Sequence, residues 1–318
     1  MTVTLPSPDS PLKIGTRGSP LALAQAHETR ARLMAALDLP DAAFAIVVIH
    51  TTGDDRQMIN ADRPLKEIGN KGLFTKEIEE AMLRGDIDIA VHSTKDMPTE
   101  QPAGLVLDTF LPREDVRDAF ISAKYDSLAA LPAGAVVGTS SLRRKAQLMT
   151  TRPDLNVVEF RGNVQTRLKK LEEGVADCSF LAMAGLSRLG LADKAASAIE
   201  PEEMLPAVAQ GAIGIERRAS DSRAAHLLAA IHDDACGTRV LCERAFLRAL
   251  DGSCETPIAA LSEIVGTQIH LRGEILRPDG SERLQTEGLA TLDAAEELGR
   301  KLGEQLLAQA GKGFFDFR

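Results

Sequence analysis

One cysteine in the C-terminal third of the chain has a setting that suits covalent chemistry. Cys254 lies in the loop Gly252-Ser253-Cys254-Glu255-Thr256-Pro257, between a predicted helix and a predicted strand. A thiol in an open loop can ionise and attack an electrophile, whereas a thiol in the core is inert. Cys178 precedes a buried strand and Cys242 lies within a helix, so we expect both in the core. By itself, the loop is better explained as holding an inert thiol.

A carboxylate beside a lysine follows a predicted strand in the first third of the chain. Asp96 and Lys95 belong to the segment His92-Ser93-Thr94-Lys95-Asp96-Met97-Pro98, which begins where the predicted strand Ile87–His92 ends. Loops at strand ends are where α/β enzymes place reacting groups, and a carboxylate there can stabilise a developing cation or move a proton. Lys95 could keep this carboxylate ionised or bind a substrate carboxylate. Considered alone, a surface ion pair of little consequence is the better explanation.

Arginines collect where predicted strands turn into predicted helices. Between residues 136 and 170, eight residues are basic and two are acidic, in a chain whose net charge is −9. Arginine supplies 25 of the 37 basic residues, and its planar fork suits bidentate binding of carboxylates. Burial of so many cations without an anion would be unfavourable, so a polycarboxylate is the natural ligand. Phosphate fits less well because no Gly-x-x-x-x-Gly-Lys loop is present, and a solvated arginine-rich surface is the alternative. The set comprises Arg17, Arg143, Arg144, Arg161, Arg167 and Arg188.

Length and composition argue against several classes of protein. With 318 residues and 44% hydrophobic content, two or three domains are expected. The longest apolar run, 42–49, is too short to cross a bilayer, and residues 1–11 lack the apolar core of a signal peptide. Net acidity and 3% aromatic residues argue against nucleic acid as a partner.

The cysteines argue against a disulfide framework and against a metal site. Four cysteines without a Cys-x-x-Cys pair favour a reducing cytoplasm. No compact zinc pattern is formed by the spacing of His226, His232, Cys236, Cys242 and Cys254. We therefore expect no metal.

The first half of the chain alternates apolar runs with amphipathic segments, which is typical of βαβ units and a mostly parallel sheet. Ser19 as N-cap and Pro20 at the first helical position predict a helix to about Leu37. The polar segment Gly53–Lys71 is expected to be a long loop and a candidate lid. The other predicted elements are strands at Leu12–Gly15, Phe44–His50 (buried) and Ile87–His92, and a helix over Leu73–Arg84 closed by Gly85.

The same alternation then restarts after a junction near Leu111–Arg117. Two similar α/β units predict two lobes with a cleft between them, and ligands of such sheets bind beyond the carboxyl ends of the strands, near helix N-termini. The elements expected are strands at Ala135–Thr139, Val157–Phe160 and Ser179–Met183, a helix capped by Ser140 or Ser141 that runs to about Thr150, and a helix capped by Asn163 that runs through Glu173 and is closed by Gly174.

From about Asp233 the pattern changes to that of a small α+β domain. An amphipathic helix is predicted over Arg239–Leu250, and a final helix over Leu292–Ala310. Between them, the segments Ile258–Glu263, Gln268–Glu274 and Gln285–Ala290 alternate in the manner of an antiparallel meander.

At this point a set of motifs, in order from about residue 12 to residue 260, resembles one enzyme family, hydroxymethylbilane synthase, also called porphobilinogen deaminase. No single motif suffices, but jointly they are very specific. They are Arg17-Gly18-Ser19-Pro20-Leu21-Ala22, Lys71-Gly72-Leu73-Phe74, His92 through Pro98, Gly138-Thr139-Ser140-Ser141-Leu142-Arg143-Arg144, Arg161-Gly162-Asn163-Val164-x-Thr166-Arg167-Leu168, Ala184-Gly185-Leu186-x-Arg188-Leu189 and Gln210-Gly211-Ala212.

The resemblance implies an α/β fold with two lobes like type II periplasmic binding proteins, plus a small C-terminal α+β domain with a three-stranded antiparallel sheet. It implies domains at 1–112 with 211–232, at 113–210, and at 233–318. It also implies a transferase that condenses four porphobilinogen molecules head to tail, with loss of ammonia, and releases the linear tetrapyrrole hydroxymethylbilane by hydrolysis. We expect a cytoplasmic monomer without nucleic-acid or membrane partners.

The resemblance further implies roles for individual residues. Cys254 would carry a dipyrromethane cofactor through a thioether, and Asp96 would stabilise the positive pyrrole nitrogen of an azafulvene and assist proton transfer. Acetate and propionate groups of the cofactor would be bound by Lys95, Ser141, Arg143, Arg144, Arg161, Arg167 and Arg188, and the substrate by Arg17, Ser19, Thr139 and Gln210. Ser253 departs from the family, which usually has a glycine there. Serine is strained if that position needs a positive φ, although we expect it to be tolerated.

The intact mass of the purified protein tests this assignment. We expect an adduct of dipyrrole size on the wild-type chain and the bare chain mass for Cys254→Ser. A solute-binding protein without catalysis, or a nucleic-acid binder, would show the bare mass in both cases, and that result would contradict the assignment.

Overall fold

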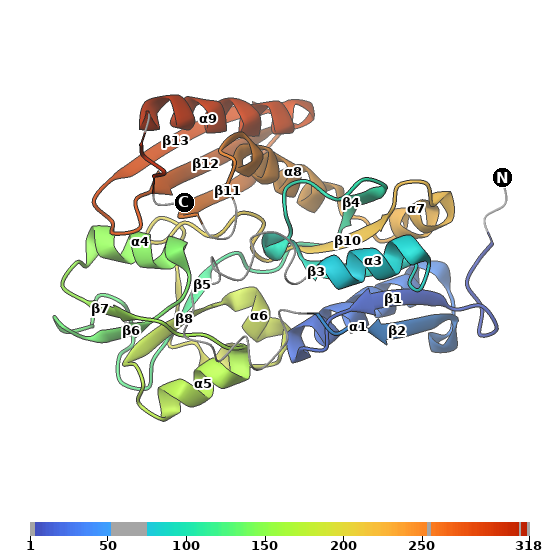
Figure 1. Ribbon diagram of the computed structural model, residues 1–318, viewed down its shortest axis with the longest axis horizontal. Coiled ribbons are helices and arrows are strands. Elements are labelled where there is room, and N and C mark those ends of the chain that lie inside the picture. Colours follow the sequence, from blue (N-terminus) through green and yellow to red (C-terminus); the bar gives the residue numbers. More distant parts are fainter. Residues whose placement is uncertain (1–3, 52–74, 253–255, 312, 317–318) are drawn as a thin grey trace. The chain divides into compact units, whose positions relative to one another are not determined.

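The computed structural model describes residues 4–51, 75–252, 256–311 and 313–316 (Figure 1). The chain forms two compact units, the first from residues 1–113 and 212–237 and the second from 114–211 and 238–318. The predicted loop Gly53–Lys71, the motif Lys71-Gly72-Leu73-Phe74, Ser253 and Cys254 lie outside the described residues. None of the described helices is both long and apolar enough to cross a bilayer.

The first unit is built on a five-stranded sheet with strand order β2-β1-β3-β10-β4. β1 pairs in parallel with β2 and with β3, whereas β10 runs antiparallel to both of its neighbours. Its elements are β1 (Leu12–Thr16), α1 (Pro20–Leu37), β2 (Phe44–Val48), α3 (Lys76–Arg84), β3 (Ile89–Ser93), β4 (Leu105–Phe110), β10 (Ile213–Arg218) and α7 (Ser222–Ala229), with short 3-10 turns η1 (Asp41–Ala43) and η4 (Thr94–Asp96).

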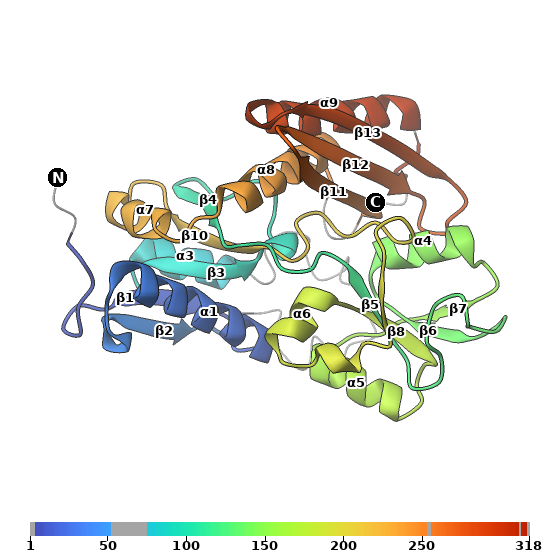
Figure 2. The same ribbon diagram turned by 180° about the vertical axis from the view of Figure 1, so that it is seen from behind.

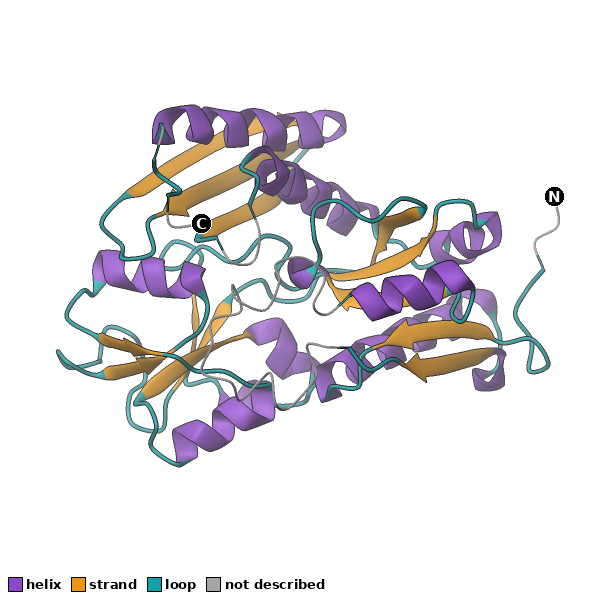
Figure 3. Ribbon diagram, in the orientation of Figure 1, coloured by secondary structure: helices purple, strands orange, loops and turns teal. Residues whose placement is uncertain are grey.

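Helices cover both faces of this sheet (Figure 3). On one face, Leu33 of α1 and Leu227 of α7 pack against strand residues such as Ile14 and Ile215. On the other face, Met82 of α3 joins a second cluster. Because both faces are buried, the central strands are apolar on both sides, as expected for an α/β sheet.

The second unit contains another five-stranded sheet, in the order β7-β6-β8-β5-β9, in which β5 is the antiparallel strand. Leu148 of α4 packs on one face, and Leu168 of α5 and Leu186 of α6 pack on the other. The elements are β5 (Asp118–Ile121), β6 (Val136–Gly138), α4 (Leu142–Thr151), β7 (Asn156–Val158), α5 (Val164–Glu172), β8 (Cys178–Ala182), α6 (Met183–Arg188), η5 (Ala192–Lys194) and β9 (Ser197–Ile199).

The C-terminal part is a three-stranded antiparallel sheet, β11-β12-β13, with two helices packed on it (Figure 2). Gly273 of β12 lies against the ring of Phe246, and Gly288 of β13 lies against Leu298 and Leu302. Small residues in the strands therefore allow both helices to approach closely. The elements are α8 (Asp234–Ala249), β11 (Ile258–Val265), β12 (Gln268–Leu276), β13 (Arg283–Thr291), η6 (Leu292–Ala294) and α9 (Ala295–Ala310).

The predicted fold class is confirmed: two α/β lobes and a small C-terminal α+β part with a three-stranded antiparallel sheet. The helix caps Ser19, Ser141 and Asn163 are confirmed, since each side chain accepts a backbone N–H at its helix start. The three-domain boundaries stay a prediction, because the second unit holds both the second lobe and the C-terminal sheet.

Both five-stranded sheets are mostly parallel, as predicted, and each includes one antiparallel strand, because the chain enters β5 and β10 directly after crossing between the units. Two details of the prediction are wrong. β2, expected to be buried, is an edge strand whose side chains are mostly half-exposed. α8 begins at Asp234, five residues before the predicted start, because Asp233 accepts the N–H of Cys236 and fixes the first turn.

A close helix contact in the C-terminal part provides a stability test. A Cβ added at Gly299 of α9 would lie 2.1 Å from the carbonyl oxygen of Cys242 in α8. We therefore expect Gly299→Ala to lower the free energy of unfolding by about 1–3 kcal/mol, despite the better helix propensity of alanine. Lys301→Ala, at an exposed position of the same helix, is the matched control and should cost nothing measurable in chemical denaturation. Equal stability of the two variants would show that α9 can move away from α8.

Candidate functional site

A pocket in the first unit forms where β1 and β3 end. Three predicted site residues line it: Arg17 and Ser19, which follow β1, and Asp96, the last residue of η4. The carboxyl ends of adjacent parallel strands meet at one edge of a sheet, which brings these residues together. The remaining lining residues are Leu21, Ala22, Gln25, Thr75, Val91, His92, Ser93 and Met97.

Local hydrogen bonds hold the walls of this pocket. Ser19 Oγ accepts the backbone N–H of Ala22 at 3.3 Å and so caps α1, which points the positive end of that helix toward the pocket. Gln25 Nε2 donates to Ser93 Oγ at 2.8 Å and ties α1 to the end of β3. The exposed Asp96 thus sits on a framework that is fixed on two sides. Lys95 is half-buried and is not one of the lining residues.

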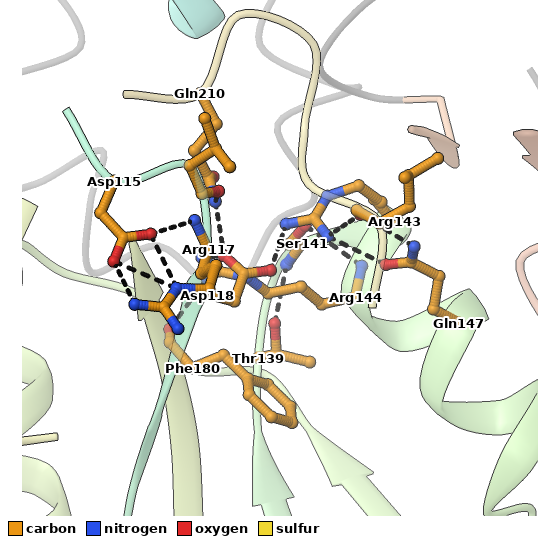
Figure 4. Close-up of polar contacts among 12 residues, drawn as sticks. Asp115, Arg117, Asp118, Thr139, Ser141, Arg143, Arg144, Gln147, Phe180 and Gln210 are labelled. Carbon is orange, nitrogen blue, oxygen red and sulfur yellow. Dashed lines mark hydrogen bonds and ion pairs between the residues drawn. The ribbon is translucent and has the colours of Figure 1, made fainter. Parts of the chain in front are cut away.

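In the second unit, one buried carboxylate holds two arginines (Figure 4). Asp118 Oδ2 accepts from Arg143 at 2.7 Å, and Oδ1 accepts from Arg144 at 2.7 Å. Asp118 is 0% exposed and each arginine is 5% exposed. Arg143 also donates to the carbonyl of Leu205, and Arg144 donates to the carbonyl of Phe180 at 2.8 Å. The two guanidinium groups are therefore fixed in place as well as neutralised in part.

The charges in this cluster do not cancel. Burial alone would raise the pKa of Asp118, but the guanidinium groups of Arg143 and Arg144 lower it well below its usual range. Two cations thus share one ionised carboxylate, which leaves an excess positive charge in the interior. The buried Nε–H of Arg143 and that of Arg144 have no hydrogen-bond partner among the described residues. An anion close to this cluster would be stabilised.

Gln210 joins the same cluster from the segment where the chain crosses back. Its side chain is 0% exposed and donates to Asp118 Oδ1 and to the carbonyl of Val116, both at 2.8 Å. Gly211 follows at φ +88°, with its position for a Cβ 2.5 Å from the carbonyl oxygen of Glu114. The two crossing segments therefore run side by side, and only glycine fits at that contact.

The remaining predicted residues lie around the N-termini of α4 and α5 and at the C-terminal end of α6. Thr139 Oγ1 accepts the N–H of Ser141, and Ser141 Oγ caps α4 by accepting the N–H of Arg144. Neither α4 nor α5 has an acidic residue in its first turn, so both helix N-termini keep their positive ends unneutralised. Arg161, Arg167 and Arg188 are half-buried: Arg161 pairs with Glu159 at 3.4 Å, Arg167 Nε donates to the carbonyl of Gly162, and Arg188 donates to the carbonyl of Gly211.

Two kinds of functional residue escaped the sequence prediction. Asp118 and Gln147 were missed because their importance depends on contacts 25 or more residues away, as in the bond from Gln147 Nε2 to Glu274 at 2.6 Å. Gln25 and His92 were missed as pocket residues, although His92 stands in a motif that the prediction quoted. The sequence signal that could have indicated Asp118 is the charged pair Arg117-Asp118 at the start of β5.

The cysteines of the core are confirmed as inert. Cys178 and Cys242 are fully buried, and burial raises the pKa of each thiol to about 12. Cys236 is also buried. Since the thiolate is the nucleophile, none of these three suits covalent attachment at neutral pH.

Comparison with known proteins identifies the family. The model of the porphobilinogen deaminase dipyrromethane cofactor binding domain matches residues 12–226, and that of the porphobilinogen deaminase C-terminal domain matches residues 237–308. The chain belongs to the porphobilinogen deaminase family. It is 64% identical to porphobilinogen deaminase of Paracoccus denitrificans, over 98% of this chain and 99% of the relative. It is 54% identical to the chloroplastic porphobilinogen deaminase of Oryza sativa, over 96% of this chain and 86% of the relative.

Solved structures match part of the chain. A periplasmic substrate-binding protein of an ABC transporter from Coxiella burnetii is 16% identical, with a TM-score of 0.40, over 71% of this chain and 93% of that one. Membership of the porphobilinogen deaminase family overturns the alternative of a solute-binding protein without catalysis.

The buried cluster predicts a specific response to acid. Because the pKa of Asp118 is lowered in the fold, its stabilisation is complete above the unfolded value of about 4 and is lost as the pH falls toward the folded value. At pH 7, Asp118→Asn should cost about 3–5 kcal/mol, since it leaves two buried guanidinium groups uncompensated. The difference between wild type and variant should shrink below about pH 4.

Urea denaturation of both proteins between pH 2.5 and pH 8 measures this difference. Asp154→Asn is the control, because Asp154 pairs with Arg152 at the surface and should leave stability unchanged. A constant difference across the whole pH range would show that Asp118 is not ionised in the fold.

Proposed function

We propose that Asp96 is the reacting carboxylate, and Cys254 the point of cofactor attachment, of a hydroxymethylbilane synthase. The family fixes the reaction: four porphobilinogen molecules are condensed head to tail, with loss of ammonia, onto a dipyrromethane primer, and the linear tetrapyrrole is released by hydrolysis. The chain is a transferase of tetrapyrrole biosynthesis. The observation that carries the assignment of Asp96 is its place in a pocket with Arg17 and Ser19 at the strand ends.

The pocket offers complementary groups to porphobilinogen, a pyrrole with two carboxylates and an aminomethyl group. Arg17, Ser19 and the positive end of α1 supply donors for a carboxylate. Asp96 supplies an acceptor that can hold positive charge as ammonia leaves and can take a proton from the pyrrole when the new bond has formed. Lys95, next to Asp96, remains one of the residues that we propose to bind the cofactor.

The second unit offers groups that fit the dipyrromethane cofactor, whose two rings carry four carboxylates. The excess positive charge of the Asp118 cluster and the two unneutralised helix N-termini favour an anion. We propose that Ser141, Arg161, Arg167 and Arg188 bind its carboxylates, and that Arg143, Arg144, Thr139 and Gln210 contribute there. When bound, the cofactor supplies a free pyrrole carbon to which the first substrate is joined.

Attachment at Cys254 is supported by elimination and by position. The three other cysteines are buried, and two of them have pKa values of about 12. In the sequence, Cys254 stands between the end of α8 and the start of β11, four residues before β11. A cytoplasmic location, a monomeric state and the absence of nucleic-acid partners are proposed from composition, and size-exclusion chromatography tests the second of these.

Replacement of the carboxylate by an amide tests the proposed chemistry. Asp96→Asn keeps the shape but loses the charge, so we expect the dipyrrole adduct to be retained while turnover of porphobilinogen falls about 100-fold to 10,000-fold. Intact mass and steady-state rates measure the two properties. Asp9→Asn, an exposed aspartate of the same unit, is the control and should behave as wild type. Wild-type rates for Asp96→Asn would remove Asp96 from catalysis.

A further inference from the structure

A buried cluster of three titratable side chains lies beside the pocket of the first unit, and the chemistry above does not use it. His92 Nε2 lies 3.1 Å from Glu216 Oε2, so β3 is joined to β10 by a side-chain contact. Glu216 is 0% exposed and His92 is 7% exposed. Glu79 of α3, also buried, completes the group. Burial of an ionisable side chain costs free energy, so the presence of three such groups in one core requires an explanation.

The hydrogen bonds of His92 assign its two ring nitrogens. An ionised Glu216 can only accept, so Nε2 of His92 carries the proton in their contact. Nδ1 has no partner among the described residues, and His92 is part of the pocket wall. The nitrogen that remains for a ligand is therefore Nδ1. A carboxylate behind an imidazole is a common way to fix its orientation.

The surroundings of Glu216 leave His92 as its main partner. Glu216 Oε1 is buried and has no hydrogen-bond partner in the described part of the chain, so its charge is compensated chiefly by His92. Burial raises the pKa of Glu79, and the charge of Glu216 raises it further, whereas the bond with Thr75 and the charge of His92 oppose this rise. From the pocket side, the charged lining residues are Arg17 and Asp96.

We infer that His92 binds a carboxylate of porphobilinogen through its Nδ1–H, and that Glu216 is a positioning residue that holds the imidazole oriented and charged. The inference rests on the proposed function of this pocket. His92 would be a second cation, besides Arg17, on the side of the pocket that contains Ser19. Asp96 remains available to act on the reacting atoms. A substrate with two carboxylates can use both cations, which would select it over a pyrrole that carries only one.

Two amide substitutions distinguish a ligand contact from a structural one. The amide of His92→Asn lies near the place of Nδ1, whereas that of His92→Gln lies near the place of Nε2 and can keep the bond to Glu216. For the holoenzyme, we expect KM for porphobilinogen to rise about tenfold or more in His92→Gln and clearly less in His92→Asn, with kcat reduced far less than KM. The control is His226→Gln, at an exposed position in α7 of the same unit.

The pH dependence of KM provides a measurement that needs no variant. Since Nδ1 can donate to a carboxylate only while it carries a proton, wild-type KM should rise as the pH increases, and this rise should be absent in both amide variants. Glu216→Gln should move the rise to lower pH, because it removes the charge that stabilises the imidazolium.

The outcomes separate this inference from the proposed function. Wild-type KM values for His92→Gln, or a wild-type KM that does not change with pH, would overturn the role of His92 while leaving Asp96 untouched. A fully active Asp96→Asn would instead overturn the proposed function of the pocket, whatever the result for His92. If neither amide variant folds, the wild-type pH profile decides.

Discussion

The second unit depends on one buried carboxylate. Asp118, the first residue of β5, joins α4 through Arg143 and Arg144 and joins the returning segment through Gln210. Burial of three charges costs several kcal/mol per ion and is tolerated only when hydrogen bonds satisfy them closely. Here five side-chain and backbone acceptor atoms receive hydrogen bonds from the two guanidinium groups. The arrangement therefore fixes where both crossing segments and the start of α4 lie.

Helix α4 also connects the Asp118 cluster to the C-terminal sheet. One turn after Arg143, Gln147 accepts from Arg143 and donates to Glu274 of β12, which also accepts from Arg283 at 2.7 Å. One turn further, Thr150 Oγ1 lies 3.2 Å from the carbonyl of Gly280 in the β12–β13 hairpin. Because positions three and four apart share a helix face, one stripe of α4 makes all these contacts. The sheet that follows Cys254 is thus held to the lobe that carries the proposed anion-binding residues.

Features that depend on residues nearby in the sequence were predictable, whereas features that depend on contacts between distant residues were not. Ser19, Ser141 and Asn163 cap their helices as expected, because a cap needs only the next three residues. The meander of β11, β12 and β13 was also predictable from its alternation. β5 escaped notice because it is four residues long and begins with a charge, and the role of Asp118 depends on partners 25, 26 and 92 residues away. The sequence motifs include Arg143 and Arg144, but only the structure shows that Asp118 already pairs with both of them.

Because Asp118 already pairs with Arg143, a substitution of Arg143 would affect the fold as well as the binding of any other anion. Arg143 donates from two nitrogens to three acceptors, Gln147, Leu205 and Asp118, and a lysine at this position has no fork with which to reach them together. A variant at Arg143 would shift the N-terminus of α4 and with it Ser141, even if the guanidinium never met the cofactor. Arg161, by contrast, is half-buried, and its ion pair with a largely exposed Glu159, at 3.4 Å, contributes little to stability. A loss of cofactor assembly therefore reports on anion binding more directly at Arg161 than at Arg143.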